Sequence, residues 1–521
     1  MKAPIGRPAP LLLAAALFIL INLTTLTQYP PAHSDEAWLA GLSKAYLQSG
    51  TPYVTEPFFD LMPRQPHLIK SLFHSLQAAF IGVFGYSLFG IRLLSLCGAA
   101  LGGYLMLRLL DREAAPGWAP ALTLLFLLNP QVHYAGRLGR QEILLMCVLL
   151  AALLLLKDPM ANPEQGAGRA GALVGLAIGL HPNAFIIALM VGSIILWEVT
   201  AKGASPAALW RYSTPLAVFA AAFVLLSLWG NPLFFWDYWE YGRTLSVDAG
   251  AAGRLQGLGA FYLKLWGRIS GTYYLPELRG FFAAALLLVG AALAVIVRCL
   301  RLYPRYAEDL MPPLMQLVGF NLGIFIIGRY NPTAILFAVP PVFLLAGRLA
   351  FRLPWNRRMG AYLTAPLVLL SVFLLRTEAA PFPPGAYAEY EAEIRGNLPP
   401  DARVLGNLSS GFAFQDRPFW DIRNLAYLKD TDLLTYLQDR DINTLVHYEE
   451  YDYIHRNPQW QILYGDDSGY YDDLMTLIDE RGFLLHRFES PFYGTRIIRY
   501  MGDHPWTVSI YRISPFSGNA P

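Results

Sequence analysis

The sequence predicts a polytopic α-helical membrane protein with a soluble α/β domain at its C-terminal end. Of its 521 residues, 55% are hydrophobic and only 15% are charged, which is less charge than a soluble protein of this length carries. Apolar runs long enough to cross about 30 Å of hydrocarbon recur up to residue 376. After that residue the composition becomes charged, and short apolar runs alternate with helical patterns.

The apolar runs of residues 1–376 predict about eleven membrane-spanning helices. The first follows the basic residues Lys2 and Arg7. We interpret it as an uncleaved span and not as a signal peptide, because the run is long and no small-x-small cleavage site follows it. The predicted spans are 10–28, 91–109, 117–132, 142–156, 170–183, 184–199, 213–229, 280–298, 309–327, 333–350 and 359–376.

The basic residues predict which side of the membrane each loop occupies. With a cytoplasmic N-terminus and alternating spans, every cytoplasmic loop contains lysine or arginine, in agreement with the positive-inside rule. The run 67–85 fits this alternation only as a helix lying along the outer membrane surface. The outer segments are then 29–90, 133–141, the turn at His181, 230–279, 328–332 and everything after residue 376. We therefore expect a multi-pass protein of the cytoplasmic membrane.

Residues 377–521 are expected to form the soluble α/β domain on the outer side of that membrane. They open with the proline-rich linker TEAAPFPPGAY. The size, about 140 residues, is usual for one domain. Strands are predicted at 402–407, 443–448, 482–488, 495–500 and 508–513, and helices at 431–440 and 471–480.

The first outer loop contains an adjacent pair of carboxylates, Asp35 and Glu36, in the stretch HSDEAW. One explanation is structural: acidic residues in a first helical turn interact favourably with the helix dipole, and Ser34 can cap the helix. The other is catalytic, with one carboxylate as a general base whose pKa is raised by burial and by its neighbour. An apolar stripe is expected to seat this helix on the membrane and consists of Trp38, Leu39, Leu42 and Tyr46.

Further candidates lie at the outer ends of other spans. The stretch RLGRQE contains Arg137, Arg140 and Glu142, and paired arginines suit a phosphate, which they bind through two hydrogen bonds each. His181 lies in the turn GLHPN, whose Pro-Asn pair is also ordinary turn punctuation. The structural alternative for the charged residues is an interfacial anchor.

The stretch GRYNPT places Arg329 and Tyr330 at another outer helix end, as candidates for substrate binding or as interfacial anchors. The long outer loop 230–279 is rich in aromatic residues, which indicate an interfacial belt or a surface that stacks on sugar or lipid. Its glycines between 242 and 260 predict a mobile segment that can act as a lid.

Charge and cysteine content exclude several classes of function. The formal net charge of +2 gives no electrostatic case for binding nucleic acid. Cys97, Cys147 and Cys299 lie in or beside apolar runs, without the C-x-x-C spacing of a zinc site. We therefore expect neither a disulfide framework nor a structural zinc ion.

The order of these motifs resembles the polyprenyl-phosphate-sugar glycosyltransferases of the GT-C superfamily, which include protein O-mannosyltransferases and lipid A aminoarabinose transferases. The resemblance covers residues 1–376 and rests on SDEAW after the first span, then RLGRQEIL, GLHPN and GRYNPT. It implies a membrane-embedded inverting transferase. The donor is a sugar on a polyprenyl phosphate, and the acceptor is a hydroxyl of a glycan, lipid or protein at the outer membrane face.

The resemblance also implies roles for individual residues. Asp35 matches the acidic residue of the family's first loop, its proposed general base, and Glu36 matches the neighbour. Glu142 stands where the family has a second acidic residue, with Arg140 beside it. Substrate-binding roles extend less directly to Arg137, His181 and Arg329.

One stretch departs from the family pattern. The family has a Lys-Pro-Pro-like segment that faces the donor phosphate, whereas this chain reads DLMPRQPHLIK at 60–70. Arg64 or His67 is expected to take that role.

Metal dependence varies across the superfamily, and the sequence does not require a metal. A divalent cation such as Mg²⁺ or Mn²⁺ can be held by Asp35, Glu36 and Glu142. An alternative function is a membrane carrier or flippase for a lipid-linked sugar, and another is an inactive relative that acts as a scaffold. Carriers place ionisable residues in the middle of their spans, whereas these charges cluster at outer helix ends, which favours an enzyme.

Overall fold

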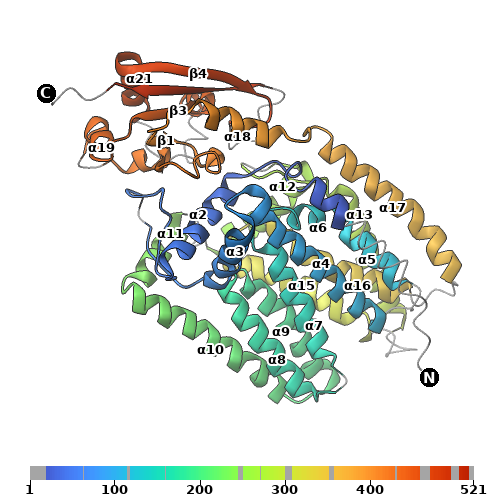
Figure 1. Cartoon of the computed structure of the whole chain (residues 1–521). Coiled ribbons are helices and arrows are strands. Elements are labelled where there is room, and N and C mark those ends of the chain that lie inside the picture. The colour runs from blue at the N-terminus through green and yellow to red at the C-terminus, as the bar shows by residue number, and fades with distance from the viewer. Residues whose placement is uncertain are drawn as a thin grey trace.

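Apolar helices form most of the molecule, and a small β-sheet unit lies against one end of them (Figure 1). The computed structural model describes residues 19–62, 64–113, 118–158, 160–244, 250–269, 272–299, 308–350, 357–428, 431–457, 470–494 and 504–514. The predicted span 10–28 lies largely outside these residues, and its described part is helical at 19–24.

Helices coincide with the other predicted spans, as the fold class requires. They are α4 (Leu88–Glu113), α5 (Ala119–Leu127), α7 (Glu142–Leu156), α8 (Pro163–Leu176), α9 (Ala184–Lys202), α10 (Ala207–Gly230), α13 (Arg279–Cys299), α15 (Met311–Ile327), α16 (Val339–Ala350) and α17 (Arg357–Ala379). Within the described part of the chain, five stretches are long and apolar enough to cross a membrane by themselves. Large apolar side chains face outward on α10, α13 and α17, for example Leu225, Leu287 and Leu369, and form a lipid-facing surface. The chain is a multi-pass membrane protein.

Shorter helices connect these spans at the end that carries the sheet. They are α2 (Ser34–Ser49), α3 (Ser71–Phe84), α6 (Pro130–Ala135), η1 (Ala177–Gly179), α11 (Phe234–Thr244), α12 (Ala251–Gly267) and η2 (Pro332–Ala338). The predicted surface helix 67–85 corresponds to α3. The predicted span 117–132 is broken into α5 and α6 because Asn129 caps α6 and Pro130 follows it.

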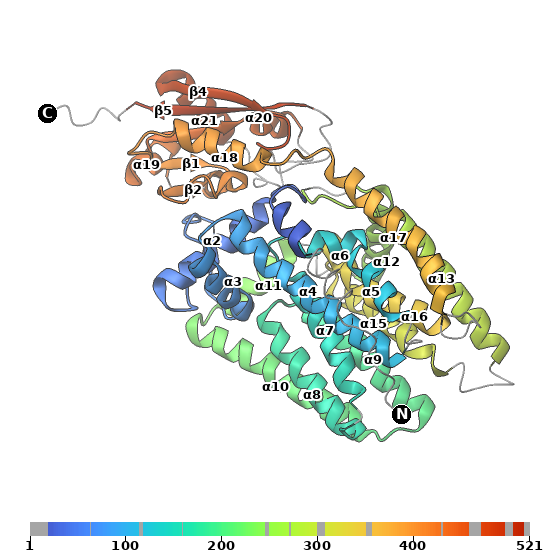
Figure 2. The ribbon, with the colours of Figure 1, turned by 45° about the vertical axis from the view of Figure 1, so that its right-hand side comes forward.

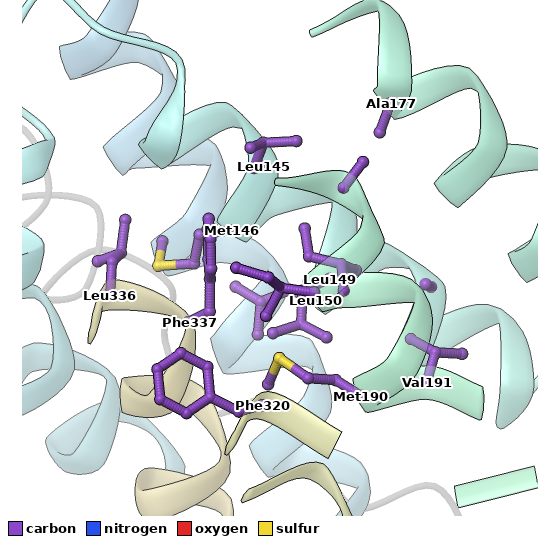
Figure 3. Packing of buried hydrophobic residues seen from close by; sticks show 14 of the residues in the cluster. Leu145, Met146, Leu149, Leu150, Ala177, Met190, Val191, Phe320, Leu336 and Phe337 are labelled. Carbon is purple, nitrogen blue, oxygen red and sulfur yellow. The ribbon is translucent and has the colours of Figure 1, made fainter. Parts of the chain in front are cut away.

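The core of the helical part is built around α7, whose sequence is apolar on every face. Leu145, Met146 and Leu149 are each 0% exposed. They lie among side chains of α9, α15 and η2, including Met190 and Phe337 (Figure 3). This packing fixes the outer end of α7, where Glu142 is the first helical residue.

A close contact of two backbones joins α8 to α10. Small residues line the buried face of α8, including Gly171 and Gly175 one turn apart, and such spacing lets helices approach closely in membranes. A Cβ atom at Gly171 would clash with the carbonyl oxygen of Tyr212. One turn earlier, a Cβ at Gly168 would make an ordinary contact, 3.5 Å from the carbonyl oxygen of Arg211.

The C-terminal domain, which we define as residues 386–514, contains a five-stranded mixed sheet of order β2-β1-β3-β5-β4. Strands β1 and β2, and β1 and β3, pair in parallel, whereas β5 runs antiparallel to both β3 and β4. Its elements are α18 (Ala386–Asn397), β1 (Val404–Gly406), η3 (Leu408–Ser410), β2 (Phe419–Asp421), η4 (Ile422–Tyr427), α19 (Leu433–Asp439), β3 (Thr444–Tyr448), α20 (Glu449–Arg456), α21 (Tyr470–Arg481), β4 (Gly482–Ser490) and β5 (Trp506–Ile513).

Most of the elements expected in this domain are present. Predicted strands 402–407, 443–448, 482–488 and 508–513 contain or overlap β1, β3, β4 and β5, and the two predicted helices correspond to α19 and α21. The predicted strand 495–500 lies outside the described residues. Strand β2 and helices α18 and α20 were not predicted from the sequence.

The C-terminal domain and the first outer loop share one hydrophobic core. Helix α17 runs along the outside of the helical part and delivers the chain to α18 (Figure 2). Ala37 and Phe58 from the first outer loop belong to the same buried cluster as Leu405 and Phe412 from the C-terminal domain. The domain is therefore packed directly onto α2, the helix whose first turn contains the Asp35–Glu36 pair.

The close contact of α8 with α10 predicts that Gly171→Ala destabilises the protein. The added methyl group must push the helices apart, and such overpacking costs about 1–3 kcal/mol. The unfolding temperature of detergent-purified protein should fall for Gly171→Ala and stay equal or rise slightly for Gly168→Ala. Equal unfolding temperatures for wild type and both variants would contradict this account of the contact.

Candidate active site

Helix α2 begins with a reciprocal cap, at the end of the helical part that carries the C-terminal domain. His33 is the N-cap: its Nδ1 accepts a hydrogen bond from the backbone N–H of Asp35 at 3.0 Å, and its own N–H donates to the Glu36 carboxylate at 3.0 Å. The prediction that Ser34 caps this helix was wrong, because Ser34 is already helical. The cap directs the two adjacent carboxylates into different surroundings.

Glu36 is enclosed in the protein and pairs with Arg92 of α4. Both side chains are 0% exposed, and Arg92 donates two hydrogen bonds to the carboxylate, at 2.7 and 2.8 Å. The N–H of Gly139, in the second outer loop, donates to the same carboxylate at 2.7 Å. A Cβ atom at Gly139 would lie 2.6 Å from Cδ1 of the Ile91 side chain, so a larger residue here would require Ile91 to shift. Glu36 thus ties three segments together.

Asp35 faces a partly open site. Its side chain is 23% exposed, and one carboxylate oxygen accepts hydrogen bonds from the Arg140 guanidinium and the Tyr273 hydroxyl. Arg140 is in turn held by Glu142, at 2.8 Å. Thr333 of η2 donates to Glu142 at 2.9 Å. Four segments distant in sequence thus converge on the outer end of α7.

Electrostatics keep Arg140 charged in this setting. Burial alone would lower the pKa of Arg140, but the charges of Glu142 and Asp35, with Tyr273, hold it well above its usual range. Tyr273 stacks on His33 with ring centres 4.5 Å apart. Burial raises the pKa of Tyr273, so its hydroxyl stays protonated and can donate to Asp35.

Lys70 and Arg329 are cations that form no ion pair with a carboxylate in the described part of the chain. Burial, with repulsion from Arg329, Arg64 and Arg140, lowers the pKa of Lys70 to about 8. His181 lies in the same field: burial first, then Lys70 and Arg329, hold its pKa well below the usual value, so it is neutral. This unneutralised positive charge is suited to an anion.

An apolar cavity of about 480 Å³ adjoins these residues at Arg329, at His181 and at Ile69, the chain neighbour of Lys70. Its polar rim includes His181 and Arg329, and most of its wall is apolar or aromatic, including Phe234 and Trp239 of α11. Of the glycine-rich stretch 242–260 predicted as a mobile lid, residues 242–244 end α11 and residues 251–260 are helical in α12, whereas residues 245–249 lie outside the described residues. A cavity with a charged mouth and an apolar interior suits an amphiphile with an anionic head.

Arg64 and His67 lie near Lys70 in the first outer loop. Arg64 binds the Glu56 carboxylate at 2.7 and 3.2 Å, and its charge outweighs burial to lower the pKa of Glu56 to about 2. Burial and the charges of Lys70 and Arg64 lower the pKa of His67 to about 4, so His67 is neutral at pH 7. Arg64 is thus a partly compensated cation.

Arg137 and Tyr330 have other partners. Arg137 donates to the backbone oxygen and hydroxyl of Thr25, and lies 3.2 Å from a ring nitrogen of His133. The Tyr330 hydroxyl donates to the carbonyl oxygen of Arg254 on α12. These contacts join Arg137 to the end of the first helix and Tyr330 to α12.

The carboxylates considered as cation ligands are occupied by other partners. Glu36 is held by Arg92, and Glu142 and Asp35 are held by Arg140. Among the residues that the structure describes, no three His, Cys, Asp or Glu side chains converge as a metal site. This arrangement does not fit a divalent cation held by Asp35, Glu36 and Glu142.

Three residues of this site, Arg92, Lys70 and Tyr273, were not predicted from the sequence. Arg92 offered a usable signal, because a charge inside an apolar span is costly without a partner. Lys70 lies in the stretch DLMPRQPHLIK, but nothing in the pattern distinguished it from Arg64. Tyr273 is one of many aromatics in its loop, and only the fold brings it to Asp35.

Comparisons with known proteins agree with this architecture. The family model described as Glycosyltransferase family 87 matches residues 71–322. No curated protein matches the chain. The crystal structure of ArnT from Cupriavidus metallidurans bound to undecaprenyl phosphate is similar with a TM-score of 0.60 and 14% sequence identity, covering 97% of this chain and 98% of that chain. The apo state of the same protein gives 0.55 and 12%, covering 96% and 98%. The likeness therefore extends over both the helical part and the C-terminal domain.

The different surroundings of the adjacent carboxylates predict different effects on stability. Glu36→Gln leaves Arg92 buried with an uncompensated charge, which costs about 3–5 kcal/mol. Asp35→Asn should change stability little, because Asp35 is partly exposed and Arg140 keeps Glu142. Thermal unfolding of the two purified variants measures this contrast, and a smaller loss for Glu36→Gln than for Asp35→Asn would refute it.

Proposed function

Since the chain has the fold of the GT-C glycosyltransferases, which confirms the predicted resemblance, we propose that it is an inverting glycosyltransferase. It moves a sugar from a polyprenyl phosphate to a hydroxyl of a glycan, lipid or protein at the outer face of the cytoplasmic membrane. The observation that carries the proposal is the combination of Asp35, held by Arg140, with the cations Lys70 and Arg329, of which Arg329 lines an apolar cavity.

The cavity and its charged mouth fit the two ends of the donor. The isoprenoid chain occupies the apolar wall of α9, α10, α11 and α15, which it reaches from the bilayer. The phosphate binds Lys70 and Arg329, with neutral His181 as a hydrogen-bonding neighbour. The Arg64 guanidinium adds positive charge in the field of Lys70. It is not a direct phosphate ligand in this scheme, since Glu56 already balances part of its charge.

The reaction follows from these positions. The acceptor oxygen attacks the anomeric carbon of the sugar and forms the new glycosidic bond as its proton passes to the Asp35 carboxylate. The bond from that carbon to the phosphate oxygen breaks, and the electron pair leaves with the polyprenyl phosphate. Lys70 and Arg329 stabilise the charge that develops on this leaving group. Attack opposite the leaving group inverts the anomeric centre.

Glu36 and Glu142 have supporting tasks in this scheme. Glu36 fixes the start of α2 through Arg92, and Glu142 holds Arg140 against Asp35. Tyr273 and Arg140 orient one oxygen of Asp35. Neither glutamate exchanges a proton with substrate.

The proposal is tested by adding purified protein to a panel of polyprenyl-phosphate sugars and following donor consumption by mass spectrometry. At least one donor should be consumed, with release of polyprenyl phosphate, when a hydroxyl acceptor is present. Binding or transbilayer movement of a donor without consumption would instead favour a carrier.

Asp35→Asn should lower kcat by about 10²–10⁴-fold, the usual contribution of a general base, because the amide cannot accept the acceptor's proton. Donor affinity should stay near that of wild type, because Lys70 and Arg329 are untouched. Asp439→Asn, which alters an exposed carboxylate on α19, is the matched control and should leave kcat unchanged. Normal transfer by Asp35→Asn would exclude it as the base.

The pKa of Lys70 predicts a pH dependence of donor capture. Below pH 8 the ammonium is charged and attracts the phosphate, and as the pH rises through about 8 that charge is lost. The kcat/KM for the donor should therefore fall on the alkaline side in the wild type. In Lys70→Arg the fall should move to higher pH, since arginine stays protonated. If kcat/KM for the donor falls at the same alkaline pH in both proteins, the deprotonation of Lys70 is not the cause of the fall.

A further inference from the structure

The C-terminal domain holds the backbone of the first outer loop through hydrogen bonds of the Asn424 side chain, in η4. The side-chain oxygen of Asn424 accepts hydrogen bonds from the backbone N–H groups of Asp60, Leu61 and Met62, at 3.2, 3.3 and 3.4 Å. Its side-chain nitrogen donates to the carbonyl oxygen of Phe58 at 2.9 Å. Asn424 is 0% exposed, so its amide is committed to four backbone groups of one loop segment.

Arg423, the preceding residue, reaches the aromatic side chains of the same loop and of α2. Its guanidinium lies 4.7 Å from the ring centre of Trp38 and 4.8 Å from that of Phe59. A two-point ion pair with Asp421, at 2.6 and 3.1 Å, fixes the arginine. At the outer edge, Tyr436 and Arg440 both bind the Asp60 carboxylate.

These contacts lead directly to the loop's cations. The indole N–H of Trp38 donates to Glu56 at 2.6 Å, and Glu56 binds Arg64, whose guanidinium lies 4.9 Å from the Trp38 ring centre. The chain then continues from the segment held by Asn424 through Arg64 to Lys70, whose field includes Glu56 and Arg64. The contact of Arg423 with aromatic side chains and the contact of Asn424 with the loop backbone therefore both act on the segment that carries Arg64 and Lys70.

We propose that Arg423 and Asn424 are positioning residues for the donor phosphate, supplied by the C-terminal domain. This inference rests on the proposed function. Residues 51–62 and 64 form neither helix nor strand, so ordering this segment at each binding event would weaken donor affinity. The domain removes that cost by holding the loop in place, so that Lys70 is already positioned for the phosphate while Arg64 stays paired with Glu56. The domain thus contributes to the donor site, besides any part it takes in acceptor choice.

The test compares two asparagines of the same domain. Asn424→Ala removes the hydrogen bonds of this side chain to the loop backbone. Asn443→Ala is the matched control, since the Asn443 side chain bonds only within the domain, to the backbone of Asp401 and Arg403 and to the Thr444 hydroxyl. Each variant is assayed for thermal unfolding, for kcat and donor KM, and for direct binding of undecaprenyl phosphate by native mass spectrometry.

Asn424→Ala should raise the donor KM and the Kd for undecaprenyl phosphate at least tenfold while kcat changes less than threefold, and Asn443→Ala should change neither constant. Equal donor constants in both variants would overturn the inference and leave the proposed function intact. A wild type that neither consumes a donor nor binds undecaprenyl phosphate would overturn the proposed function itself.

A milder variant covers the case in which Asn424→Ala does not fold. Asp60→Asn weakens the partly exposed contacts of this side chain with Arg440 and Tyr436, leaves Asn424 in place, and should raise the donor KM by a smaller factor. An unchanged donor KM in Asp60→Asn, together with a failure of Asn424→Ala to fold, would count against a positioning role.

Discussion

The buried ion pair between Glu36 and Arg92 is the interaction on which the site depends. It joins the start of α2 to α4, and the Gly139 amide adds the second outer loop to the same carboxylate. Two fully buried charges are tolerated only because each satisfies the other and neighbouring carbonyl groups fill the remaining donors of Arg92. With Glu36 fixed inward, the adjacent Asp35 faces outward, next to Arg140 and Tyr273. The buried carboxylate of Glu36 therefore sets the position of the partly exposed carboxylate of Asp35.

Charge balance separates the structural part of the site from the part suited to a ligand. Arg92, Arg140 and Arg64 each face a carboxylate, so their charges are largely used within the protein. Lys70 and Arg329 lack such partners among the described residues, and Arg329 and the Lys70 neighbour Ile69 line the apolar cavity. An anionic group on an isoprenoid chain satisfies both features, whereas a neutral or water-soluble ligand satisfies only one.

Hydropathy and charge patterns were sufficient to predict the helical architecture, because a membrane restricts the chain to apolar helices of known length. The same signals singled out Asp35, Arg140 and Glu142, and the fold brings these three together. They could not identify Tyr273, because its place beside Asp35 depends on how a loop 238 residues away in sequence returns to α2. Trp38 was expected to seat α2 on the membrane; it instead packs against Phe59 and Arg423, since the C-terminal domain covers that face. Contacts between segments that are distant in sequence leave no periodic pattern in the local sequence. The position of Tyr273 and the packing of Trp38 therefore could not be predicted from that pattern.

A structure of the protein with undecaprenyl phosphate bound, determined by cryo-electron microscopy in lipid nanodiscs, tests the central claim most directly. The account predicts phosphate density within hydrogen-bonding distance of Lys70 and Arg329, with the isoprenoid chain in the cavity beside α11 and Asp35 facing the phosphate. Phosphate density on another part of the surface, with Lys70 and Arg329 uninvolved, would contradict it.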